Sequence, residues 1–145
     1  MSTDHPQLSA KMSRVMINTR IGIHSHEHNR TQRLCVSCEI GFVPRRWPAI
    51  DIGDVYDYDA LYRFVTQTIP MDPHIELIET LIEKLLAFVF QDDCVRDVRI
   101  DLAQPDILPF CSGVGVAAHW TRDAWLKSQR PSAIMPERVV IVAEE

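Results

Sequence analysis

The chain has no long hydrophobic segment. Its longest unbroken apolar run is Leu85–Phe90, which is far shorter than the ~20 residues that a helix needs to cross a bilayer. The first ten residues include Asp4 and His5 and lack the apolar core of a secretory signal. We therefore expect a soluble, cytoplasmic protein that has no membrane partner.

The chain is also poor in lysine and has no excess of positive charge. Only three of its 15 basic residues are lysines, and 20 acidic residues bring the net charge to −5 at pH 7. Proteins that bind nucleic acid usually present a concentrated basic surface, so the composition argues against a nucleic-acid partner. Four cysteines fit a reduced chain better than a disulfide scaffold. No phosphate-binding glycine loop, serine-hydrolase motif or HExxH motif is present.

The pattern of apolar residues predicts a single α+β domain. A length of 145 residues suits one domain, and an apolar content of 46% is too high for a disordered chain. Alternating apolar residues predict strands, while helical periodicity and capping residues predict helices. The predicted strands are Arg14–His24, Arg33–Pro44, Val95–Pro105 and Ser112–Trp120; the predicted helices are Tyr58–Thr68 and Met71–Gln91. In the second helix Asp72 is the expected N-cap and Pro73 the first helical residue.

The element order is therefore ββααββ, which predicts a four-stranded antiparallel sheet with both helices on one face. We divide the chain into a flexible N-terminus (residues 1–12), a folded domain (13–121) and a C-terminal extension (122–145). The extension has room for one short strand at Val139–Val142.

Glu79 is the most informative single residue of the predicted second helix. At about 100° per residue it falls on the apolar face that carries Ile75, Ile78 and Ile82. An ionised carboxylate among aliphatic side chains is costly unless it has a partner. Two interpretations remain: Glu79 reaches water at the rim, or it anchors a ligand that offers two parallel N–H donors, such as a guanidine-like heterocycle.

Three histidines give a second, weaker signal. His24, His26 and His28 share one face of an extended chain, and such a set can bind a metal ion, with His119 as a fourth ligand. Histidines in a polar hairpin loop are more often only solvated, so we expect no metal and keep this site as the alternative.

Three motifs together resemble the dihydroneopterin aldolase family and its epimerase relatives. The first is Ile21-Gly22-Ile23-His24, followed by Glu27 and Gln32-Arg33-Leu34; the second is Asp54-Val55-Tyr56-Asp57-Tyr58; the third is Leu77-Ile78-Glu79, followed by Ile82-Glu83. They occur in the family's order and at its spacing, and the resemblance covers roughly Ser13–Thr121. It implies a T-fold subunit that assembles into a tetrameric barrel, usually stacked as an octamer, with active sites between subunits.

The resemblance also implies a reaction and roles for residues. The substrate is 7,8-dihydroneopterin, and retro-aldol cleavage gives 6-hydroxymethyl-7,8-dihydropterin and glycolaldehyde without a metal or other cofactor. Glu79 holds the 2-amino and N3 edge of the pterin, and Ile78, Leu77 and Tyr56 complete the substrate-binding set. Tyr58 takes part in proton transfer. Glu27 orients the substrate hydroxyls or the catalytic groups.

Gln104 departs from the family pattern. In relatives a lysine at this place, before the proline that ends the third strand, acts as general acid and base. Glutamine forms hydrogen bonds but does not titrate, and loss of one positioned base typically lowers a rate by ~10²–10⁴. Three hypotheses follow: an impaired aldolase in which Gln104 takes the catalytic position, a pterin-binding paralogue with different, metal-assisted chemistry, or a pterin binder without catalysis.

Overall fold

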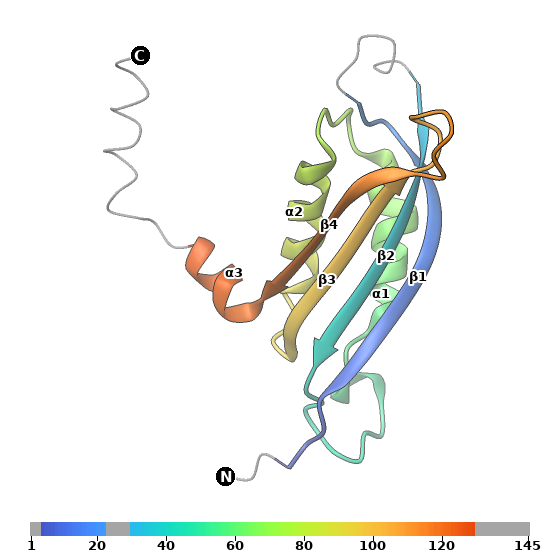
Figure 1. Cartoon of the computed structure of the whole chain (residues 1–145). Helices are drawn as coiled ribbons and strands as arrows, with labels where there is room; N and C mark the ends of the chain where they lie inside the picture. Colours follow the sequence, from blue (N-terminus) through green and yellow to red (C-terminus); the bar gives the residue numbers. More distant parts are fainter. Residues whose placement is uncertain (1–3, 23–29, 130–145) are drawn as a thin grey trace, which may run out of the picture.

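The structure is a computed structural model, and it describes residues 4–22 and 30–129. Four strands form one antiparallel sheet in the order β1-β2-β3-β4: β1 (Leu8–Thr19), β2 (Gln32–Phe42), β3 (Val95–Gln104) and β4 (Val114–Thr121). Helices α1 (Tyr58–Arg63) and α2 (Ile78–Val89) cover one face of this sheet (Figure 1). The predicted α+β class and the ββααββ order are confirmed.

Short helical turns and one further helix complete the described fold. The 3₁₀ turn η2 (Ile52–Asp54) precedes α1. A π-helical turn, η3 (Phe64–Thr68), and a 3₁₀ turn, η4 (Ile69–Met71), continue α1. Helix α3 (Arg122–Ser128) follows β4 directly. No helix in the described ranges has the length and apolar character of a membrane span.

The core lies between the sheet and the two covering helices. Alternate residues of the central strands point into it, and Leu34, Val36, Ile40, Val98 and Leu102 are fully buried. Each such side chain contributes about 1.5–3 kcal/mol when it leaves water. The opposite face carries polar and charged side chains, as expected of an antiparallel sheet with one face on the core.

The first strand begins earlier than the sequence predicts. Strand β1 starts at Leu8, which pairs with Phe42, so the end of the segment expected to be a flexible N-terminus belongs to the sheet. The pairing register shifts between Met12 and Val15, and Arg14 there has a φ of 58°. This bulge breaks the alternation of apolar residues, which is why the pattern read from Arg14 onward missed the first half of the strand.

The second helix begins later than the sequence predicts. Asp72 is not its N-cap; its carboxylate instead accepts from Lys84 Nζ at 2.8 Å. Ile75 is extended and forms an isolated parallel bridge with Ile21. The expected helix start at Met71–Pro73 is therefore wrong, and Glu79 lies in the first turn of α2 rather than in its second turn.

The start of the C-terminal extension is a helix that the sequence analysis did not predict. Thr121 caps α3 by accepting from the backbone N–H of Ala124. Trp125 stacks on Phe90, with ring centroids 5.7 Å apart. The predicted strand at Val139–Val142 lies outside the described residues, and the domain boundaries remain predictions.

Candidate functional site

The two ends of the sheet differ in composition. At the Gln104 end, β1 and β3 finish, β2 and β4 begin, and α2 begins. At the Phe42 end, β2 and β4 finish, β3 begins, and α1 begins. Figure 1 shows these as the upper and lower ends of the sheet. The predicted site residues that the structure describes divide between them.

The start of α2 exposes a carboxylate beside free backbone donors. Leu77, at the N-cap, is extended (φ −118°, ψ 134°), and no side-chain hydrogen bond caps the helix. The N–H groups of Ile78 and Glu79 therefore point out of the first turn without an intrahelical acceptor. Leu77 is 53% exposed and Glu79 is exposed as well. The exposure of Glu79 fits both interpretations of this residue, a carboxylate that reaches water at the rim and a carboxylate that is open to a ligand.

Glu79 lies at a groove between α2 and the edge strand β4. The groove has a volume of about 480 Å³. Its carboxylates are Glu79 and Glu83, and the part of the chain that the structure describes puts no basic side chain on its walls. Its apolar walls come from three elements, namely Ile82 and Leu86 of α2, Val116, Ala118 and Trp120 of β4, and Trp125 of α3.

The sequence analysis missed the two tryptophans of this groove. Trp120 and Trp125 meet edge to face, with ring centroids 6.3 Å apart. Their closeness depends on the turn from β4 into α3, and the five-residue spacing alone does not predict that turn.

Gln104 is the last residue of β3 and lies opposite Val114 of β4. Its side chain is half-buried, and its Nε2 is buried with no hydrogen-bond partner among the described residues. A buried donor without an acceptor costs about 1–3 kcal/mol. The Gln104 end therefore holds a side-chain donor suited to an acceptor from outside this chain.

The two tyrosines lie at the Phe42 end. Tyr58 begins α1 and is 60% exposed. Tyr56 is buried, with its ring centroid 6.4 Å from that of Phe42. Burial is the main reason that the pKa of Tyr56 lies far above its usual value, and nearby acidic groups, Cys38 foremost, raise it further. Its burial in the core argues against the predicted contact of Tyr56 with substrate.

Of the remaining predicted residues, some lie outside the described ranges and one lies on the polar face of the sheet. Glu27, His24, His26 and His28 lie outside the described residues. His119 lies on the polar face, with its Nε2 2.9 Å from Asp97 Oδ2. Within residues 4–22 and 30–129 no group of three metal-binding side chains comes together.

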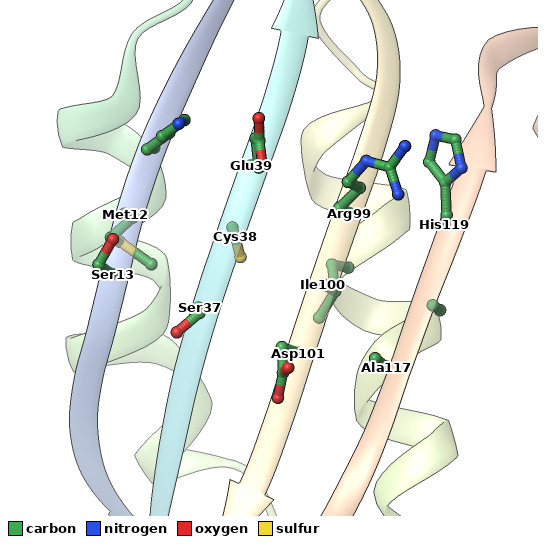
Figure 2. A pocket seen from close by; sticks show the side chains of 12 residues that line it. Met12, Ser13, Ser37, Cys38, Glu39, Arg99, Ile100, Asp101, Ala117 and His119 are labelled. Atoms are coloured by element: carbon green, nitrogen blue, oxygen red, sulfur yellow. The ribbon is translucent and has the colours of Figure 1, made fainter.

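A hollow of about 430 Å³ on the polar face mixes charges of both signs (Figure 2). Glu39, Arg99 and His119 cross it in one row of neighbouring strands. Because the row carries side chains of both charges, it favours neither an anionic nor a cationic ligand.

Comparisons with known proteins show that the chain is similar to one enzyme family. The sequence model of the family described as dihydroneopterin aldolase (FolB) matches residues 11–119. A putative dihydroneopterin aldolase from Vibrio cholerae has 24% identity and a TM-score of 0.70, covering 84% of this chain and 100% of that one. No curated protein matches the chain.

Two further solved structures have ligands. The dihydroneopterin aldolase of Burkholderia thailendensis bound to guanine has 25% identity and a TM-score of 0.67, covering 81% of this chain and 93% of that one. The dihydroneopterin aldolase of E. coli in complex with neopterin has 20% identity and a TM-score of 0.69, covering 77% of this chain and 97% of that one. Since the family model spans most of the chain and includes the start of α2 and Gln104, this protein belongs to the dihydroneopterin aldolase family.

Proposed function

We propose that this protein binds a reduced pterin at the Gln104 end and cleaves 7,8-dihydroneopterin slowly by a retro-aldol reaction. The observation that carries the proposal is the exposed Glu79 carboxylate on the uncapped first turn of α2. Family membership supports it. So do the relatives bound to neopterin and guanine, because both ligands present a 2-amino group, a ring N–H and an adjacent carbonyl on one edge.

The start of α2 matches that ligand edge group by group. The 2-amino and ring N–H groups donate in parallel to the two oxygens of Glu79, which is the stronger, charge-assisted form of hydrogen bond. The adjacent carbonyl accepts from the backbone N–H of the first turn at Ile78. Leu77, half exposed beside them, covers a face of the ring.

The site needs a second copy of the chain. Tyr58 begins α1 at the Phe42 end, whereas Glu79 and Gln104 lie at the opposite end of the same subunit. The described strands β1 and β4 each pair on one side only, and an open edge is a template for pairing with another chain. A homo-tetramer or octamer closes these edges and brings Tyr58 of one subunit toward Glu79 of the next.

Gln104 sets the limit on catalysis. In the cleavage, the proton of the second side-chain hydroxyl leaves, its C–O bond becomes the carbonyl of glycolaldehyde, and the electrons of the broken carbon–carbon bond enter the ring. A proton then adds to the carbon left on the pterin. Gln104 Nε2 can hold the hydroxyl oxygen but cannot take its proton. Tyr58 of a neighbouring copy, one of His24, His26 and His28, or a water held by Glu27 remains to act as base, so we expect a rate ~10²–10⁴ below that of a lysine-bearing relative.

Glycolaldehyde release from 7,8-dihydroneopterin tests the proposal. The wild type and Gln104→Lys are compared with and without a chelator, and we expect weak, chelator-resistant release that the lysine raises at least about tenfold. A vigorous wild-type rate that Gln104→Lys does not improve would show that another group already acts as base. Loss of activity with chelator would favour the metal-assisted alternative.

A pterin binder without catalysis is the second candidate, and the untitratable Gln104 favours it. Tight neopterin binding with no release from either protein would establish it. Absence of both binding and release would refute the proposed function altogether.

A further inference from the structure

The chain just beyond β1 is held by hydrogen bonds to three consecutive carbonyl groups. Arg20 O accepts from Ile75 N at 2.9 Å, and Ile21 O accepts from Gln32 Nε2 at 2.9 Å. Gly22 O lies 2.6 Å from His74 Nε2. The backbone N–H of Gly22 in turn donates to Ile75 O at 3.0 Å. We call the pairing of Arg20–Gly22 with His74 and Ile75 the clamp.

Two features of the clamp restrict which residues can form it. A carbonyl oxygen only accepts hydrogen bonds, so His74 Nε2 must carry the hydrogen that points at Gly22. Gly22 has a φ of 141°, a conformation that only glycine adopts without strain. Neither His74 nor the structural need for this glycine could be recognised from the local sequence pattern.

The clamp explains why α2 begins where it does. Asp72 and Pro73 are good residues for a helix start, yet the helix does not use them. Both backbone groups of Ile75 are bonded to Arg20 and Gly22, which keeps this residue out of the helix. The helix can then begin only beyond Ile75, and its first residue is Ile78.

We propose that His74 is a positioning residue that fixes the start of α2 and so keeps the ligand-binding donors of its first turn free. Without the clamp the helix extends back to Pro73. The N–H groups of Ile78 and Glu79 then bond to the carbonyls four residues earlier, at His74 and Ile75. A ligand carbonyl loses its backbone donors while the Glu79 carboxylate stays in place. The effect on ligand binding rests on the proposed function, whereas the effect on the helix start does not.

Two variants separate positioning from general stability. His74→Leu removes the donor, and His74→Gln keeps an amide N–H at a similar reach. Backbone chemical shifts and amide exchange of residues 74–79 report the helix start, and calorimetric titration with guanine reports the site without turnover. We expect helical shifts back to Pro73, protected amides at Ile78 and Glu79, and at least about tenfold weaker guanine binding in His74→Leu. His74→Gln should retain the wild-type helix start at Ile78 and bind guanine within about threefold of wild type.

The outcomes distinguish this inference from the proposed function. If wild type binds neither guanine nor neopterin, the proposed function fails, and the backbone measurements still test the clamp. If residues 74–77 stay non-helical in His74→Leu, or if both variants weaken guanine binding equally, the positioning role is overturned. Should His74→Leu not fold, His74→Asn, whose amide is too short to reach Gly22, takes its place under the same criteria.

Discussion

The two ends of the sheet use their polar groups differently. At the Phe42 end they bond to one another: Arg122 donates to the carbonyls of Val95, Phe90 and Asp92 at 2.6–3.2 Å, and Arg45 pairs with Asp92 and Asp93. At the Gln104 end the clamp and the Arg33–Asp106 pair also bond internally, but Gln104 Nε2 is buried without a partner among the described residues, and the first turn of α2 has no cap. Tyr56, whose buried hydroxyl has no described partner, is an exception at the Phe42 end.

This difference indicates a division of labour. Groups that bond to each other stabilise the fold, whereas groups left without partners lower stability and persist where an external molecule completes them. Changes at the Phe42 end that leave Tyr58 in place should therefore lower the free energy of unfolding more than they weaken ligand binding. Changes at Gln104 or in the first turn of α2 should weaken ligand binding and leave the free energy of unfolding nearly unchanged. Each prediction below tests one side of that contrast.

The largest effect on stability is expected from Phe42→Ala. Phe42 is 6% exposed and packs against Tyr56, and truncating such a side chain typically costs about 3–5 kcal/mol. Urea unfolding measures it. Phe42→Leu, which keeps most of the volume, should cost less than about 1.5 kcal/mol. Equal and small losses in the two variants would mean that this end is not the stabilising one.

Arg122→Ala should lower the free energy of unfolding by about 2 kcal/mol. It leaves three carbonyls without their charged donor and removes the guanidinium that lies 5.4 Å from the Phe90 ring centroid. Arg96→Ala is the matched control, because Arg96 is exposed and, among the described residues, donates to Asp93 O at 2.8 Å and shares with Arg122 only Val95 O, at 3.4 Å. If Arg96→Ala lowers the free energy of unfolding as much as Arg122→Ala does, the hydrogen bonds of Arg122 have no special role in stability.

A smaller, pH-dependent effect is expected at Asp92. Burial raises its pKa, but hydrogen bonds from Cys94 and Arg45 outweigh this and hold the pKa below the usual range. The pKa of Asp92 is therefore lower in the folded protein than in the unfolded chain, where it is about 3.9. The ionised carboxylate stabilises the fold fully above that unfolded pKa, and this stabilisation is lost as the pH falls through the folded pKa. Asp92→Asn should cost at most about 1 kcal/mol at pH 7. Urea unfolding at pH 7 and near pH 3 should show that cost shrinking, and a cost that stays constant would contradict the assignment.

The smallest effect on stability is expected from Leu77→Ala at the Gln104 end. Leu77 is half exposed and precedes the helix, so its truncation should change the free energy of unfolding by no more than about 0.5 kcal/mol. Guanine binding, in contrast, should weaken measurably in calorimetry. A large loss of stability with unchanged binding would reverse the proposed roles of the two ends.

The sequence predicted the architecture because its strands and helices bury one face each. The alternation in β2 and the periodicity of α2 carry that information locally. The start of α2 could not be predicted, because the clamp joins Ile75 to Arg20 and Gly22, more than 50 residues away. The bulge near Arg14 hid the first half of β1 for a similar reason, since it is defined by pairing with β2.

The candidate site stays a prediction, but its placement can be compared with the sequence. The motif predicts a site at Leu77–Glu79, and the structure places Gln104 at the same end of the sheet as this segment. The burial of Tyr56 could not be foreseen, because it depends on contact with Phe42 across a connecting loop. Neither could the groove walls from Trp120 and Trp125, which come together only once β4 turns into α3.

Calorimetric titration of neopterin into wild type, Glu79→Ala and Glu83→Ala tests the central claim most directly. Both glutamates lie on the same groove and carry the same charge, so the control separates a specific contact from a general loss of negative potential. Glu79→Ala should weaken binding by at least about 2 kcal/mol, the value of a charge-assisted pair, while Glu83→Ala should bind as wild type does. Unchanged affinity in Glu79→Ala, or equal losses in both variants, would contradict the account.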